Sequence, residues 1–369
     1  MRTHLKRLTT TAVLAALLLA AAPSPTTAAG DLWGLKTHYR DFEVVALDPT
    51  LTAADAADGR IDLTLFGRTY TALVAPAPWA MPTALGRMSA DGTVVLEPLA
   101  FPPQAFLGTV EGESASRVLL SITEAGVAGL LQSPGVDLEL YPVSTHNDLA
   151  PRGLTVVVPV SAILLPNVPH REVETPRVPV DEAAPPAKPD GILQASPGPD
   201  RTALLFAESD TVRSSTTWST RIFNAYNTLN AAYDPMVGFN FVLAGGVLYY
   251  CADETCDGSW GLNTNDASTL LVNWGNKLRD FPPTSYEIAQ LIIAHTVPGY
   301  QGGAWQPGRY GFTDLRGISD AYFTRVMGHE FGHGFNGDHG QYSPFPGRAQ
   351  SWAHDHGFNH VHTVCDLSV

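Results

Sequence analysis

Two patterns of apolar and polar positions divide the chain. Residues 30–164 carry short runs in which apolar and polar residues alternate, as in RIDLTLFGRTYTALV at 60–74. Residues 106–132 read as strand, turn, strand, turn and strand, with glycine, glutamate and serine at the turns. Alternation with a period of two is typical of strands buried on one face, so this part is predicted to be β-rich.

The pattern changes after residue 200 to alternating strands and helices. The expected elements are strand 201–209, helix 215–235, strand 238–250 with a Gly-Gly break, helix 266–280 and strand 286–295. The first helix places large apolar side chains on one face: Trp218, Ile222, Tyr226, Leu229 and Tyr233. This order of elements predicts an α/β sheet with crossover helices.

Between these parts the composition shifts. Residues 165–200 are dense in proline, mixed in charge and poor in aromatic residues, which favours an extended linker. The chain is therefore predicted to hold two folded units joined by a tether.

The first residues resemble an export signal. Arg2, Lys6 and Arg7 precede an apolar run at 11–22, and small residues follow. The run is too short to cross a bilayer, which disfavours the alternative of a membrane anchor, and no later segment is long and apolar enough to cross. We expect residues 1–29 to be a signal peptide and the protein to be secreted, extracellular or periplasmic.

Charge and cysteine content narrow the classes of partner. The net charge of −14 argues against nucleic acid or an anionic membrane, because phosphate groups bind to basic surfaces. Cys251 and Cys256 could close a small disulfide loop in an oxidising compartment or remain two free thiols, and Cys365 is left without a mate.

The densest chemistry lies in HEFGHGFNGDH at 329–339. Ser319 is a candidate N-cap of the helix that leads into it. His329 and His333 are neighbours on one helix face, roughly 5–6 Å apart, so both imidazoles can reach one zinc ion. Glu330 lies beside them and can act as general base towards a metal-bound water.

A third ligand must come from beyond the helix. A left-handed turn at Asn336 would end the helix and bring His339 to the metal. No glutamate follows Glu330, and Asp355 and Asp366 are weaker substitutes.

These residues resemble the metzincin zinc-protease pattern H-E-x-x-H-x-x-G-x-x-H, with Asn336 where that family usually has glycine. Residues 291–314 are similar to the strand, loop and substrate-pairing edge strand of its adamalysin (reprolysin) branch, and residues 106–131 resemble the propeptide of that branch. The resemblance implies an α/β (α+β) catalytic domain with a mixed, mostly parallel sheet and a long zinc helix, preceded by a mainly β prodomain. It also implies site residues: zinc ligands His329, His333 and His339, general base Glu330, and substrate-edge residues Gly303, Ala304 and Trp305.

The sequence departs from the family in three further places. No methionine follows Met327 to form the methionine turn, and Gly340 follows the third histidine where the branch has aspartate. Residues 30–200 contain no cysteine, so latency would come from steric occlusion or another ligand. We expect the C-terminal subdomain of residues 201–369 to be incomplete.

Other histidines are given ordinary roles. His295 ends an apolar strand and is expected to be a satisfied structural side chain. The group His354, His356, His360 and His362 could bind a second metal, although a polar loop or tail is the favoured interpretation.

The leading hypothesis is a secreted, monomeric zinc endopeptidase made as a zymogen, acting on proteins or peptides. Its predicted parts are a signal peptide (1–29), a propeptide domain (30–164), a linker (165–200) and a catalytic domain (201–369). The rival is a non-catalytic, zinc-stabilised binding or adhesion module, or an inactive truncated protease.

Overall fold

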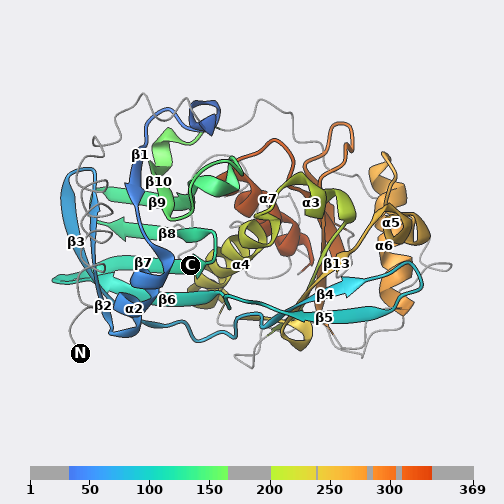
Figure 1. The fold of residues 1–369 in the computed structure, drawn as a ribbon, viewed down its shortest axis with the longest axis horizontal. Coiled ribbons are helices and arrows are strands. Elements are labelled where there is room, and N and C mark those ends of the chain that lie inside the picture. Colours follow the sequence, from blue (N-terminus) through green and yellow to red (C-terminus); the bar gives the residue numbers. More distant parts are fainter. Residues whose placement is uncertain (1–32, 165–200, 238–239, 281–285, 305–309, 335–369) are drawn as a thin grey trace, which may run out of the picture.

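The structure is a computed structural model of the chain (Figure 1). It describes residues 33–164, 201–237, 240–280, 286–304 and 310–334. The predicted signal peptide at 1–29 and linker at 165–200 lie outside the described residues, as does the chain after residue 334.

The first sheet is built by the N-terminal part and is antiparallel throughout. Its eight strands run in the order β1-β10-β9-β8-β7-β6-β3-β2. Their bounds are β1 (Glu43–Ala46), β2 (Arg60–Leu65), β3 (Arg68–Pro76), β6 (Gln104–Val110), β7 (Glu113–Thr123), β8 (Gly126–Ser133), β9 (Val136–Pro142) and β10 (Leu154–Pro159). The alternation expected from the sequence is confirmed in β2, where Ile61, Leu63 and Leu65 are buried and the residues between them are exposed.

One helix and one hydrogen bond bring the two edges of this sheet towards each other. The helix α2 (Pro49–Ala57) packs on β2 and β3, and the side chain of Asp48 caps its first backbone amides. The backbone amide of Phe66, just after β2, donates to the carboxylate of Glu43 in β1. Because β1 and β2 are the edge strands, the sheet is nearly closed into a barrel.

The second sheet is mixed. Its path runs β15-β16-β14-β11-β13-β4-β5, and β12 also pairs with β11. The bounds are β4 (Ala84–Met88), β5 (Val94–Pro98), β11 (Arg201–Ala207), β12 (Phe241–Leu243), β13 (Val247–Cys251), β14 (Ile288–Ile293), β15 (Gly302–Ala304) and β16 (Tyr310–Asp314). The strands β4, β13, β11, β14 and β16 are parallel neighbours, and β5 and β15 run antiparallel at the two edges.

Helices cover both faces of the second sheet. Their bounds are α3 (Ser209–Ser214), α4 (Trp218–Val237), α5 (Glu254–Trp260), α6 (Ala267–Asp280) and α7 (Asp320–Gly334). Short 3-10 turns complete the described elements: η2 (Leu35–Thr37), η3 (Val143–Thr145), η4 (Val160–Ala162) and η5 (Ala244–Gly246).

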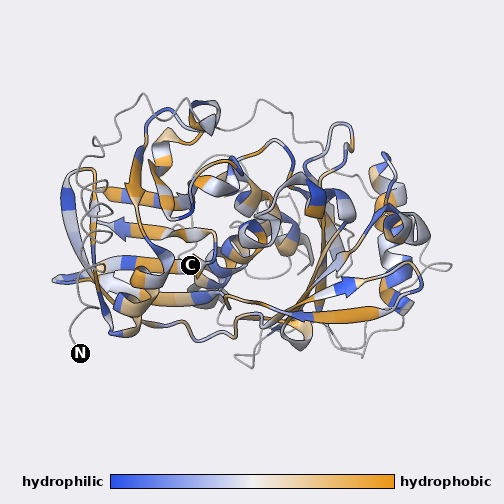
Figure 2. Ribbon diagram, viewed as in Figure 1, coloured by the Kyte–Doolittle hydropathy of each residue, from blue (hydrophilic) through white to orange (hydrophobic). Residues whose placement is uncertain are grey.

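Alternate residues of β11 explain how the layers are built. Leu205 belongs to a core with α4 and α7, whereas Leu204 and Phe206 belong to a core with α5 and α6. Helix α4 lies between the two sheets and also packs on β7 and β8 (Figure 1). Hydrophobic residues therefore run through the central strands of both sheets, as the colouring of Figure 2 shows.

The fold class expected from the sequence is wrong for this chain. The described part is mostly β: strands hold more residues than helices, and the eight-stranded, nearly closed antiparallel sheet is its largest β element. The second sheet is extended by β4 and β5 from the N-terminal part, and α7 is shorter than α4, so no single long helix dominates. Local periodicity could not predict β4, since its parallel partner β13 lies far along the chain.

Several individual elements were nevertheless predicted correctly. The helix expected at 215–235 is α4, and its five large apolar side chains are all buried. It continues two residues beyond Pro235. The helix expected at 266–280 is α6, and the strand interrupted by a Gly-Gly break is β12, η5 and β13.

Candidate metal and catalytic site

The helix that carries the histidine motif is α7, and it is unbroken from Asp320 to Gly334. Oγ of Ser319 accepts a hydrogen bond from the backbone amide of Tyr322 over 3.2 Å, which confirms the predicted N-cap. His329 and His333 both lie within α7, four residues apart. The repeat of the α-helix therefore puts these two positions on the same face, one turn apart.

The start of α7 is held by a buried ion pair. Nε of Arg221, from α4, donates to Oδ1 of Asp320 over 2.5 Å, and Oγ1 of Thr145 donates to Oδ2 of Asp320 over 2.5 Å. Burial raises the pKa of Asp320, but the Arg221 guanidinium and these hydrogen bonds outweigh it and lower that pKa below its ordinary value. Asp320 is therefore a buried carboxylate stabilised from two other elements.

Two further contacts anchor α7 along its length. Arg325 donates to Oε1 of Glu139, in β9, over 3.1 Å. The hydroxyl of Tyr233, in α4, donates to the backbone carbonyl of Gly328 over 3.1 Å. Because these contacts come from different elements, they set the rotation of α7 and hence the direction in which the motif points.

His329 and Glu330 are almost completely buried, with relative exposures of 1% and 2%. The Glu330 side chain packs against the backbone of β15 at Gly302. A Cβ added at Gly302 would lie 2.5 Å from Oε1 of Glu330 and 2.9 Å from its Cγ. Only glycine leaves room here for the glutamate, so the edge strand and the motif are fitted to each other.

The structure brings together only part of the site predicted from sequence. Gly303 and Ala304 lie in β15, where they pair with Phe312 and Gly311 of β16. The side chain of His333, and all of His339 and Trp305, lie outside the described residues. The prediction of three zinc ligands therefore stays a prediction.

Gly302 was missed by the sequence analysis. The double glycine at 302–303 was the signal that could have indicated it, because paired glycines in a strand often mark a close approach of another group. Its importance depends on Glu330, whose position beside β15 is set by tertiary packing.

A second group of potential ligands lies at the carboxyl ends of the parallel strands. Glu208, Asp210 and His295 each offer one ligand atom, and these atoms lie within 4.8 Å of one another. By distance the group is compatible with a metal ion.

The hydrogen bonds of His295 nevertheless favour an ion pair. Its Nδ1 lies 2.6 Å from Oε2 of Glu208, and its Nε2 lies 2.8 Å from the carbonyl oxygen of Thr264. Burial lowers the pKa of His295, but the bonds to Glu208 and Thr264 outweigh it and raise that pKa above its ordinary value. Both ring nitrogens therefore act as donors, and His295 is the satisfied structural side chain that the sequence predicted.

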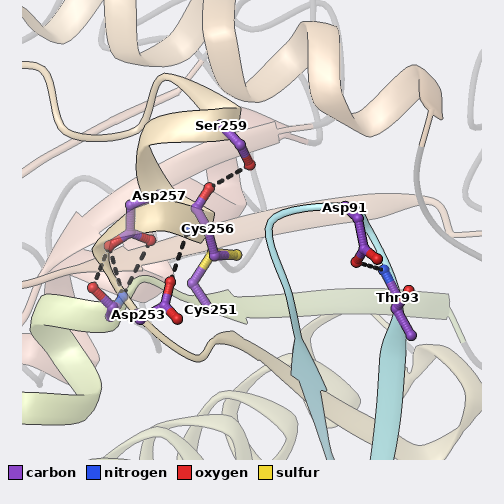
Figure 3. The surroundings of a disulfide bond; sticks show 8 residues. Asp91, Thr93, Cys251, Asp253, Cys256, Asp257 and Ser259 are labelled. Atoms are coloured by element: carbon purple, nitrogen blue, oxygen red, sulfur yellow. Dashed lines mark hydrogen bonds between the residues drawn. A yellow bond between two sulfur atoms is a disulfide. The ribbon is translucent and has the colours of Figure 1, made fainter.

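Cys251 and Cys256 form a disulfide (Figure 3). Cys251 ends β13, and the backbone amide of Cys256 donates to Oδ1 of Asp253 at the start of α5. The turn between β4 and β5, which includes Asp91, lies in the same region (Figure 3).

Among the helices of the described residues, none is long and apolar enough to cross a membrane.

No protein-family model matches the chain, and no curated protein matches it. Among solved structures, "Crystal Structure of metalloproteinase-II from Bacteroides fragilis" is 11% identical, with 85% of this chain and 86% of that chain covered and a TM-score of 0.42. A second, "Structure of a chaperone-substrate complex", is 17% identical over 36% of this chain and 25% of that chain, with a TM-score of 0.25. Both TM-scores are low.

Proposed function

We propose that the chain is a secreted zinc-dependent endopeptidase that hydrolyses peptide bonds in proteins or peptides. The observation that carries the proposal is the position of Glu330. It is a buried carboxylate next to a buried imidazole, His329, on one unbroken helix, and it packs against the edge strand β15. A buried carboxylate does not contribute to an apolar core, so its burial here indicates a functional role. Its neighbour His329 is a residue of a type that commonly binds metal ions.

The donor set suits zinc. An imidazole at 329 and a second histidine one helical turn later are the nitrogen ligands that Zn²⁺ takes in catalytic sites, which keep a position open for water. His329, His333 and His339 would hold the ion, His339 by the resemblance to metzincins. When bound, the ion would polarise the peptide carbonyl and lower the pKa of a water molecule.

Glu330 would act as the base. Its carboxylate lies against Gly302, so a proton held on it stays next to the strand where a substrate would lie. The burial of the side chain excludes bulk water from this carboxylate, which strengthens its interaction with a developing positive charge.

The edge strand β15 would bind the substrate. Among the described residues it is the last strand of the second sheet on this side, with β16 as its neighbour in the sheet order. An extended peptide can add to such an edge through backbone hydrogen bonds. Gly303 carries no side chain that would obstruct this approach.

The disulfide between Cys251 and Cys256 and the signal-like residues at 1–29 support secretion. Disulfides persist in oxidising compartments and are rare in the cytosol. Mass spectrometry of the mature N-terminus of exported protein tests this part of the proposal.

The test of catalysis is Glu330→Gln. The amide keeps the shape of the side chain but cannot take a proton, so hydrolysis of an unfolded protein should fall by about 10²–10⁴-fold while the zinc content stays unchanged. Glu124→Gln is the control, because Glu124 is an exposed carboxylate paired with the exposed Arg152 and is no part of the proposed site. Unchanged hydrolysis by the Glu330→Gln protein would falsify the catalytic role.

Removal of zinc by a chelator should abolish hydrolysis, and His329→Ala should lower the zinc content from about one ion per chain. Zinc at that level in the unaltered protein without hydrolysis would instead support the rival function, a zinc-stabilised binding module.

A further inference from the structure

We infer that residues 33–164 and 201–334 form a permanent two-part body: when the segment between them is cut, the two parts stay bound to each other. The inference concerns assembly and does not depend on the proposed function. Three independent contacts between the parts carry it.

The first contact is a strand donated across the two parts. Strand β4 pairs in parallel with β13, in a register that runs from Ala84 opposite Val247 to Met88 opposite Cys251. Backbone bonds extend this pairing at both ends, from the Thr83 amide to the Gly246 carbonyl and from the Ala252 amide to the Met88 carbonyl. Figure 1 shows β4 and β5 alongside β13, with the helices of the C-terminal part beside them.

Strand β13 needs this neighbour. All five of its residues are buried, so it is a central strand by composition and by position. Without β4, its outer edge would present a row of unpaired backbone groups along an apolar strand. Exposed edges of this kind pair with other chains and aggregate.

One position shows how closely β4 and β13 fit. A Cβ added at Gly86 would lie 2.6 Å from Cδ1 of Tyr249 and 2.9 Å from Cγ1 of Val247. The Tyr249 ring is 2% exposed, so it cannot easily move aside. Gly86 is therefore a docking position whose side chain must be absent.

The second contact is a ladder of buried polar side chains on α4. Oγ of Ser121, in β7, donates to Oδ1 of Asn224 over 2.8 Å and accepts from Nδ2 of Asn227 over 2.8 Å. Nε1 of Trp79 donates to Oδ1 of Asn227 over 2.9 Å. Loss of the N-terminal part would replace these bonds by bonds to water, at a net loss of about 0.5–1.5 kcal/mol for each bond.

The third contact is a shared hydrophobic core together with the anchor of α7. Trp79, Ala105 and Leu119 from the N-terminal part belong to the same buried cluster as Leu205 and Phe223. Thr145 and Glu139, also from the N-terminal part, bind Asp320 and Arg325 of α7. Separation of the parts would thus expose apolar core and release the helix that bears the motif.

The experiment uses the full chain with the recognition sequence of a site-specific protease inserted between residues 180 and 181. After cleavage in native buffer near pH 7.5, the two pieces should co-elute in size-exclusion chromatography with the mass of the uncut chain. They should separate only in denaturant. Two separate peaks in native buffer would overturn the inference.

Variants test which contacts hold the two pieces together. In the cut protein Gly86→Val should raise the dissociation constant of the two pieces at least tenfold, because the new side chain collides with the Tyr249 ring. Val95→Thr is the control, since Val95 lies on β5 and is 42% exposed, and it should leave the dissociation constant unchanged.

A second variant covers the case in which Gly86→Val fails to fold. Ser121→Ala removes the hydroxyl that joins Asn224 and Asn227 and should also raise the dissociation constant about tenfold. If the folded variants release the N-terminal piece no more readily than the unaltered protein does, the inference is wrong. Because these readouts measure assembly and not hydrolysis, a failure here is distinct from a failure of the proposed function.

Discussion

Thr145 and Asp320 lie 175 residues apart in the sequence, and Oγ1 of Thr145 donates a hydrogen bond of 2.5 Å to Oδ2 of Asp320. Both side chains are buried. Asp320 is the first residue of the helix that carries His329 and Glu330. The N-terminal part of the chain thus helps to fix the start of the helix that bears the candidate site.

Thr145→Val should lower the free energy of unfolding by about 1–3 kcal/mol, because Asp320 stays buried and loses one of its donors. Urea unfolding monitored by circular dichroism measures this change. Thr64→Val is the matched control, since Thr64 bonds Thr69 in an exposed pair and should change stability by less than about 0.5 kcal/mol. Equal effects of the two substitutions would show that the Thr145–Asp320 bond contributes no more to the free energy of unfolding than an exposed hydrogen bond does.

His146 should make the stability depend on pH. Its Nε2 lies 2.7 Å from the Tyr39 hydroxyl oxygen and its Nδ1 lies 3.2 Å from Oγ1 of Thr145, with the His38 ring and Asp320 nearby. Burial lowers the pKa of His146 from 6.5 to about 4, so the folded state keeps the ring neutral where the unfolded chain binds a proton. The contribution of the neutral His146 ring to the free energy of unfolding is fully present above about pH 6.5. It is lost as the pH falls towards 4, by roughly 2–3 kcal/mol.

Urea unfolding of the unaltered protein and of His146→Gln between pH 7.5 and pH 4 tests this prediction. The difference in stability between the two proteins should shrink or reverse at low pH. Asp257 and Asp314, whose pKa values burial raises to about 6, stabilise the fold as the pH falls. They are present in both proteins and cancel in the comparison, so a difference that is constant with pH would argue against a titrating His146.

Gly302→Ala should reduce hydrolysis by about 10²-fold with little change in zinc content. The added methyl group would displace the Glu330 carboxylate, and a displacement near 1 Å at a catalytic group has an effect of this size. Gly258→Ala is the control, because a Cβ there meets only ordinary van der Waals distances in α5. Steady-state kinetics and metal analysis of both variants test this prediction. Full activity of the Gly302→Ala protein would show that Glu330 does not act from its proposed position.

Replacement of Cys251 and Cys256 together by alanine should lower stability by about 2 kcal/mol. The disulfide closes a loop of short sequence separation, 5 residues, and the loop-closure entropy of so small a ring is near this value. Thermal or urea unfolding measures the loss. The unaltered protein in a strong reductant should show the same shift, and no shift in either case would mean that the bond does not constrain the unfolded chain.

Much of the local structure followed from the sequence. The period-two alternation in 60–74 predicted β2 and β3, and Ser319 predicted the start of α7, because strand periodicity and N-cap chemistry depend on neighbouring residues alone. The chemistry at 329–333 stays a prediction: the spacing of two histidines and a glutamate indicates a metal site, but the side chain of His333 lies outside the described residues.

The tertiary structure decided the rest. Three features depended on contacts between residues that are distant in the sequence. They are the pairing of β4 with β13, the close approach of Gly302 to Glu330, and the hydrogen bond from Thr145 to Asp320. Local propensity carries no information about such contacts, because they form only when separate apolar faces pack into one core. The sequence by itself determined several of the local elements and the reactive groups, while the packing of α4 between the two sheets determined which of those groups meet.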